Sequence, residues 1–163
     1  MTKINYQKEL EKIIEEVKRG NKTPRLFLHS CCAPCSSYCM EYLCQFFRLT
    51  VYYYNPNISS SAEYQKRVWE EKRLIEIYNR EKKGYPIEMI EGDYEPAKFL
   101  EAVKGFEDCP EGGRRCFHCF ALRLSETAKR AFEGQFDFFG TTLTISPLKN
   151  AEIINEIGEQ MSE

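Results

Sequence analysis

The sequence predicts an α/β protein with a mainly parallel sheet flanked by helices. Short apolar and β-branched segments alternate along the chain with longer amphipathic ones, which is the order that strand–helix–strand units produce. Turn and helix signals separate each strand from the next, so a crossover fits between neighbouring parallel strands. No repeat, low-complexity tract or linker-like shift in composition divides the 163 residues. We therefore expect one domain over residues 1–163.

The first half of the chain predicts two helix–strand pairs. Apolar residues from Leu10 to Val17 share one helical face, and Gly20 ends that helix. The sequence RLTVYYY is rich in β-branched and aromatic residues, as strands are, and the turn signal Asn55-Pro56-Asn57 follows it. The expected elements are a helix ending at Gly20, a strand at 25–29, a helix at 36–47 and a strand at 48–54.

The second half predicts a long helix and two further strands. The helix at 61–83 carries many charged residues, which indicate a solvated face. Ser146 followed by Pro147 predicts the N-cap and first position of the last helix. The other expected elements are a strand at 85–91, a helix at 95–103, a loop at 105–115, a helix from about 116 to 131 and a strand at 135–139.

Composition and charge exclude several classes of protein. The chain is 42% hydrophobic and 29% charged, and it contains no run of about 18 apolar residues that would cross a membrane. Its first 20 residues lack the apolar centre of a signal peptide. We therefore expect a cytoplasmic protein without a membrane partner. Since the net charge is −2, any contact with a polyanion has to come from a local basic patch.

Eight cysteines are unusual for a chain of this length, and most of them fall into two groups. Cys39 and Cys44, at helical spacing, are interpreted as small buried hydrophobic residues. The others are too dense for that interpretation. The first group, in CCAPC, is Cys31, Cys32 and Cys35; the second is Cys109, Cys116 and Cys119.

Three interpretations of these groups stay open at this point. Zinc fits the Cys-x-x-Cys pairs loosely, because their separation is long and adjacent ligands are awkward in one tetrahedral site. That interpretation predicts a zinc-stabilised RNA-binding module. A thiol–disulfide oxidoreductase would use Cys32 and Cys35 between a strand and a helix. The vicinal pair Cys31-Cys32 favours an iron–sulfur centre, which needs about four thiolates.

Four stretches, taken together, resemble the cobalamin-independent epoxyqueuosine reductases of the QueH type. They lie in the family's order between positions 28 and 150 and cover nearly the whole chain. The stretches are LHSCCAPCS from Leu28, YNPNI from Tyr54 with Glu63, Tyr64 and Arg67 after it, EGGRRC from Glu111 through Cys119 and Phe120, and TTLT from Thr141 through SPLKN at 146–150.

This resemblance implies a fold like that of the adenine-nucleotide α-hydrolases and the last step of queuosine synthesis. In that step the epoxide of epoxyqueuosine in tRNA is deoxygenated. The implied cofactor is a 4Fe–4S cluster beside a second, mononuclear iron. Its implied ligands are Cys31, Cys32, Cys116 and Cys119. Cys35 is a further ligand or a contact of the second metal, and ligation by Cys109 is doubtful, because the family often has another residue there.

Further residues are candidates for catalysis and for tRNA. Asp93, which follows a predicted strand, is the preferred hard ligand of the second iron; His29 and His118 are alternative ligands or proton donors. Arg114 and Arg115 precede Cys116 and could contact phosphate. The other substrate candidates are Tyr54, Asn55, Asn57, Lys149 and Asn150. Family members commonly continue with a close redox-active cysteine pair; without it, we expect an external electron donor.

Overall fold

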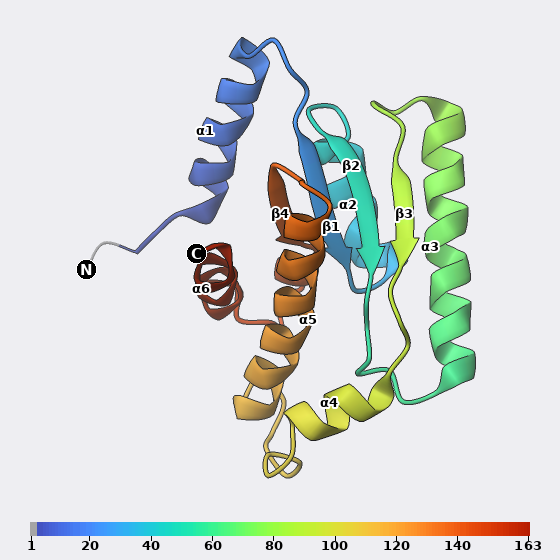
Figure 1. Cartoon of the computed structure of the whole chain (residues 1–163), viewed down its shortest axis with the longest axis vertical. Helices are drawn as coiled ribbons and strands as arrows, with labels where there is room; N and C mark the ends of the chain where they lie inside the picture. Colours follow the sequence, from blue (N-terminus) through green and yellow to red (C-terminus); the bar gives the residue numbers. More distant parts are fainter. Residues whose placement is uncertain (1–2) are drawn as a thin grey trace.

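The computed structural model describes residues 3–163 and has an α/β architecture with four parallel strands (Figure 1). The strands are β1 (Arg25–Ser30), β2 (Arg48–Tyr53), β3 (Glu88–Glu91) and β4 (Phe138–Thr141), in the order β3-β2-β1-β4. Leu26 pairs with Leu49 of β2 and with Phe138 of β4, so β1 is a central strand. The predicted fold class is confirmed.

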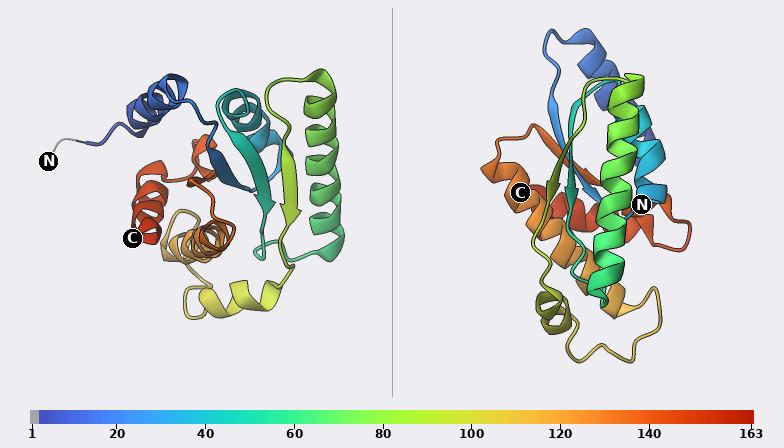
Figure 2. Two further views of the ribbon diagram at one scale, coloured as in Figure 1. Left: turned by 45° about the horizontal axis from the view of Figure 1, so that its top comes forward. Right: turned by 90° about the vertical axis from the view of Figure 1, so that its right-hand side faces the viewer.

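Helices cover both faces of the sheet (Figure 2). They are α1 (Tyr6–Arg19), α2 (Ala33–Leu43), α3 (Ser61–Glu81), α4 (Pro96–Ala102), α5 (Arg114–Glu133) and α6 (Ala151–Ser162), with a 3-10 turn at Leu143–Ile145. Leu26 and Leu28 pack with residues of α1, α2 and α3 on one face. Phe27, between them, packs with Ala131 of α5 on the other face. This alternation is the period of two that a strand imposes.

The strands all end on the same side of the sheet, the side on which α2 and α5 begin (Figure 1). The chain passes from Ser30 into α2 through only Cys31 and Cys32. The loop before α5 contains Gly112, whose φ of 83° is the left-handed conformation that glycine adopts without strain. Both cysteine groups therefore lie at the carboxyl edge of the sheet, where sites of parallel α/β proteins form.

Several boundaries differ from the predicted ones for local reasons. Strand β3 begins at Glu88 rather than at position 85, because the backbone of Ile87 is held by the side-chain amide of Asn79. Strand β4 is shifted from 135–139 to Phe138–Thr141, because Gln135 adopts a φ of 54° in the turn after α5. The last helix is capped by Asn150, not by Ser146: the Asn150 side chain accepts a hydrogen bond from the Ile153 amide at 3.2 Å.

Candidate metal centre at the carboxyl edge of the sheet

The thiols of Cys31, Cys32 and Cys35 form one compact group. Their sulfur atoms all lie within 4.8 Å of one another, and those of Cys31 and Cys32 are 3.8 Å apart. Cys32 is the N-cap of α2 and Pro34 lies in the first turn, so the helix begins directly at the thiols. All three side chains are only half-buried. Three soft ligands this close together are able to hold one thiophilic metal ion.

The surroundings of this group favour a thiolate at Cys32. The hydrogen bond between Cys31 and Cys32, together with burial, raises the pKa of the Cys31 thiol. The same hydrogen bond lowers the pKa of Cys32. The positive end of α2 favours the charged form further. Thr142, after β4, donates its hydroxyl to the Cys31 sulfur at 3.4 Å and accepts the Cys31 amide at 3.2 Å. Cys32 is therefore the most readily ionised thiol of the three.

The second cysteine group begins α5 at the same edge. The Gly112 amide donates a hydrogen bond to the Cys116 sulfur at 3.3 Å. Cys31 and Cys116 both pack against one apolar cluster that contains Phe120 and Leu143, so the two groups border the same cluster. Cys119 is buried. Among the described residues, the close group of possible metal ligands contains only the first three cysteines.

A buried polar network lies under the site on the α5 face of the sheet. The His29 ring is fully buried, with Nδ1 2.9 Å from the Thr141 hydroxyl and Nε2 2.9 Å from the Tyr54 carbonyl. Burial and the Arg123 guanidinium lower the pKa of His29 to about 3, so the ring is neutral. Asn55 donates to the Ser30 carbonyl at 2.8 Å and accepts from Arg123 at 3.2 Å. This network fixes the loop after β2 to the end of β1.

A second buried polar contact lies on the α2–α3 face. The Ser36 hydroxyl is 2.7 Å from Oε1 of Glu71 and 2.9 Å from the Cys32 carbonyl. Glu71 is fully buried, and this burial raises its pKa. Ser36 is the donor in both contacts, and its single hydroxyl hydrogen is shared between the Glu71 carboxyl and the Cys32 carbonyl. The contact joins α3 to the cysteine-bearing turn.

Several predicted site residues lie elsewhere or have other partners. Both ring nitrogens of His29 are engaged in hydrogen bonds, and its role as a metal ligand or proton donor stays a prediction. Asp93 is a surface residue: its side chain is 74% exposed, and its carboxylate is 3.9 Å from Arg130. His118 is exposed and stacks on Phe106, with ring centroids 4.5 Å apart. Cys109 lies in the loop between α4 and α5, apart from the first cysteine group.

The aromatic and amide candidates for substrate contact are mostly buried. Tyr54 is 2% exposed and stacks on Tyr52, and Asn55 is 1% exposed within the network described above. Neither side chain faces solvent, because helices cover both faces of a parallel sheet and bury the strand residues on each side. Asn57 is half-buried in the loop after β2.

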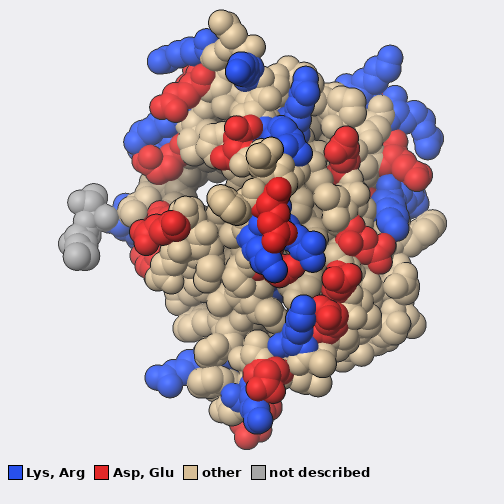
Figure 3. Space-filling model, viewed as in Figure 1, with Lys and Arg blue, Asp and Glu red and all other residues tan. Residues whose placement is uncertain are grey.

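Basic residues lie around the carboxyl edge of the sheet, but they do not form one continuous positive patch. Arg114 is exposed at the start of α5, and Arg115 donates to the Glu107 carbonyl at 3.2 Å. Lys149 lies near enough to Cys35 to lower the thiol's pKa in part, against the larger effect of burial, which raises it. Asn150 caps α6. Lysine, arginine and acidic side chains alternate over the face drawn in Figure 3.

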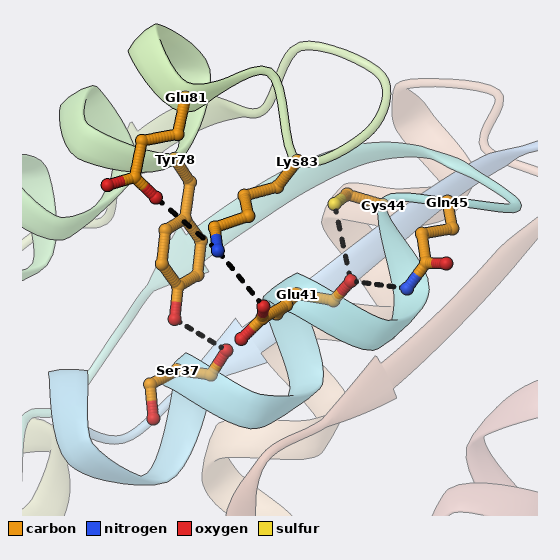
Figure 4. Close-up of polar contacts among 7 residues, drawn as sticks. All are labelled: Ser37, Glu41, Cys44, Gln45, Tyr78, Glu81 and Lys83. Carbon is orange, nitrogen blue, oxygen red and sulfur yellow. Dashed lines mark hydrogen bonds and ion pairs between the residues drawn. The ribbon is translucent and has the colours of Figure 1, made fainter.

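Cys39 and Cys44 belong to the core, as predicted. Both pack in the apolar cluster between the sheet and the first three helices. The Cys44 thiol donates to the Glu41 carbonyl at 3.6 Å. Figure 4 shows this contact beside the ties between α2 and the end of α3: Tyr78 donates to the Ser37 carbonyl, and Lys83 pairs with Glu41. These contacts fix the far end of the helix that begins at the cysteines.

Sequence reasoning missed the buried polar residues that support the site. Glu71 stands in the helix whose charged residues were interpreted as a solvated face, and Arg123 was not singled out. One signal was present for Arg123: it follows Cys119 by four residues, so the two lie on one helical face. For Glu71 the signal was its spacing from Val68 and Ile75, which are buried on the same helix.

The chain is similar to known proteins along most of its length. The family model described as "Epoxyqueuosine reductase QueH" matches residues 26–163. The epoxyqueuosine reductase QueH of Staphylococcus epidermidis is 45% identical over 158 residues, which are 96% of this chain and 66% of that protein. The Streptococcus pyogenes protein of the same name is 41% identical over 156 residues, 96% of this chain and 61% of that protein. The chain therefore spans slightly less than two thirds of the length of these relatives. Within residues 3–163, no helix is long and apolar enough to cross a membrane.

Proposed function

Because this chain belongs to the QueH family of epoxyqueuosine reductases, we propose that it converts epoxyqueuosine in tRNA into queuosine. The observation that carries the proposal is the group of three thiols within 4.8 Å at the start of α2, at the edge of the sheet where α/β proteins place their sites. The family similarity indicates which reaction we propose, and the three thiols are the residues to which we assign it.

We propose a 4Fe–4S cluster as the cofactor, held by Cys31, Cys32, Cys116 and Cys119. A second iron would lie beside it, with Cys35 as a ligand. The donor set fits such a group, since thiolates are the ligands that iron–sulfur clusters use. The N-termini of α2 and α5 fit it as well, because their positive ends favour the negative charge of thiolates and cluster.

Removing the epoxide oxygen to leave an alkene takes two electrons and two protons, and the oxygen leaves as water. When bound, the iron centre would supply the electrons and a Lewis acid for the oxygen. The chain's own residues would hold that centre in place. Thr142 fixes Cys31, and the Gly112 amide fixes Cys116. The Ser36–Glu71 contact fixes the turn at Cys32.

The proposed partner is a tRNA carrying epoxyqueuosine in its anticodon loop. Arg114, Arg115 and Lys149 are the cations that we assign to phosphate, with Asn57 and Asn150 as polar contacts near the same edge. The chain is acidic overall, so this contact is local. We further propose that an external protein donates the electrons and that the reaction takes place in the cytoplasm.

The test is a single assay on purified protein. The chain is loaded anaerobically with iron and sulfide and incubated with epoxyqueuosine-tRNA and a chemical reductant. The nucleosides are then analysed by mass spectrometry. We expect a product lighter by one oxygen, loss of this product in Cys32→Ala, and its retention in Cys44→Ala. A colourless zinc-containing protein without turnover would refute the proposal and favour the RNA-binding module. A metal-free protein with one reactive thiol would favour the thiol–disulfide oxidoreductase.

A further inference from the structure

Arg123 is a buried cation without an anionic partner among the described residues. The residue is 4% exposed, and no carboxylate of residues 3–163 lies within ion-pair distance of its guanidinium. Its Nη1 donates to the neutral side chain of Asn55 at 3.2 Å, and its Nε has no hydrogen-bond partner in the part of the chain that is described. Its guanidinium carbon also lies 5.9 Å from the centroid of the Phe120 ring.

Burial of this charge requires compensation. Removing an ion from water costs several kcal/mol even after the protein relaxes. Glu71, the buried acid on the opposite face of the sheet, can lose its charge by taking up a proton. A guanidinium cannot follow this route, because it stays protonated throughout the accessible pH range. The native protein therefore needs negative charge close to Arg123.

The geometry places that negative charge at the second cysteine group. Cys119 precedes Arg123 by one helical turn of α5, and side chains of a helix lean toward its N-terminus, so Arg123 extends toward Cys119. Cys119 and Arg123 are both buried. A thiolate at Cys119 would accept the hydrogen bond that Nε lacks.

We propose that Arg123 is the fixed counter-charge of the metal-bound thiolates, acting on the bound centre through Cys119. The inference rests on the proposed function for the identity of that centre. Arg123 is a positioning residue, since it acts through a ligand and not on the substrate. A nearby positive charge stabilises the reduced, more negative state of a cluster. Arg123 therefore raises the reduction potential and holds the cluster more tightly.

The test compares Arg123→Gln, which keeps a donor for Asn55 but removes the charge, with Arg123→Lys, which keeps the charge. Lys129→Met removes an exposed cation from the same helix and is the matched control. The first measurement is the midpoint potential of the reconstituted protein, followed by electron paramagnetic resonance. The second is the rate of iron loss to a chelator. The third is the melting temperature of the metal-free protein.

In Arg123→Gln we expect a more negative potential, iron loss at least tenfold faster, and a metal-free melting temperature equal to or above that of the parent. Arg123→Lys should recover much of the potential, and Lys129→Met should match the parent. An unchanged potential in Arg123→Gln would overturn the inference. If the parent protein binds no iron, the proposed function fails. The melting temperatures of the metal-free proteins then test the inference about Arg123. A strongly lowered melting temperature of Arg123→Gln would then make Arg123 a structural support and overturn the inference. A raised melting temperature would support the inference that the charge of Arg123 is uncompensated in the metal-free protein.

Discussion

Replacing Glu71 with glutamine should make the protein more stable at neutral pH and leave it unchanged in acid. The glutamine keeps the shape of the side chain, and its amide oxygen accepts the hydrogen bond that the Ser36 hydroxyl donates to Oε1 of Glu71 at 2.7 Å. It lacks only the ability to ionise. Because Glu71 is fully buried, the charged form is the one that the fold disfavours.

The sign and size of the effect follow from the pKa shift. Burial raises the pKa of Glu71 above its ordinary value of 4.5, so the folded protein keeps a proton that the unfolded chain releases. The stability that this carboxyl contributes is fully present below that value and is lost as pH rises through the folded-state pKa. The parent should therefore lose up to about 1.4 kcal/mol per pH unit in that window, relative to Glu71→Gln. For a chain of this size, 1 kcal/mol shifts the melting temperature by roughly 2–4 °C.

The assay is urea unfolding of the metal-free parent and variant from pH 4 to pH 8. Glu76→Gln, at an exposed position of the same helix, controls for the loss of one surface charge. We expect the stability curves of parent and Glu71→Gln to meet near pH 4 and to separate as pH rises, with the variant above. Parallel curves, or a variant that is less stable at pH 8, would show that Glu71 is ionised in the fold and would refute the reasoning.

Three further predictions concern the proposed site. Cys116→Ala should lose most of its bound iron, because this thiol lies at the edge that both cysteine groups share. Cys44→Ala should keep its iron, because that thiol lies in the core. Equal iron losses in the two variants would contradict this division. Asp93→Asn should turn over at the parental rate, as its carboxylate is mostly exposed. A variant that keeps the colour of the cluster but loses most of its turnover would instead support Asp93 as a ligand of the second metal. Affinity for epoxyqueuosine-tRNA should fall as salt rises, with a slope of about 0.7–0.9 per phosphate contact, and Arg114→Gln with Arg115→Gln should reduce that slope; a slope unchanged by the double substitution would remove these arginines from the interface.

The order of the elements could be predicted from the sequence because burial imposes a visible period on it. Strands β1 and β2 were predicted to within one residue, since a strand buried on both faces is a continuous apolar run bounded by polar turns. The first cysteine group could also be assigned to the carboxyl edge, because it directly follows a predicted strand; the structure places the start of α5, with Cys116 and Cys119, at the same edge. The sequence did not show that Tyr54 and Asn55 are buried. They follow β2 toward the carboxyl edge, but their side chains point into the protein.

The buried charges were not predicted, because helical spacing gives only a weak signal for which charged residue faces inward. Glu71 and Arg123 stand among many solvated residues of the same types, and the packing of α3 and α5 on the sheet distinguishes them. The placement of Asp93 has a similar cause. Asp93 follows β3, which is an outer strand, whereas Cys31 follows the central strand β1. Both residues lie at the carboxyl edge of the sheet, but they are separated because β2 lies between their strands.

The two buried ionisable residues, Glu71 and Arg123, contribute differently to the charge at the carboxyl edge of the sheet. On the α2–α3 face, Glu71 can become neutral, so it adds no negative charge beneath the cysteines. On the α5 face, Arg123 stays positive, and His29 beside it is held neutral, with its pKa lowered to about 3. The N-termini of α2 and α5 add their partial positive charges at the same edge. The hydrogen bond from Cys31 lowers the pKa of Cys32, whereas burial raises the pKa of Cys35 and of Cys119, so the thiols at this edge do not ionise alike.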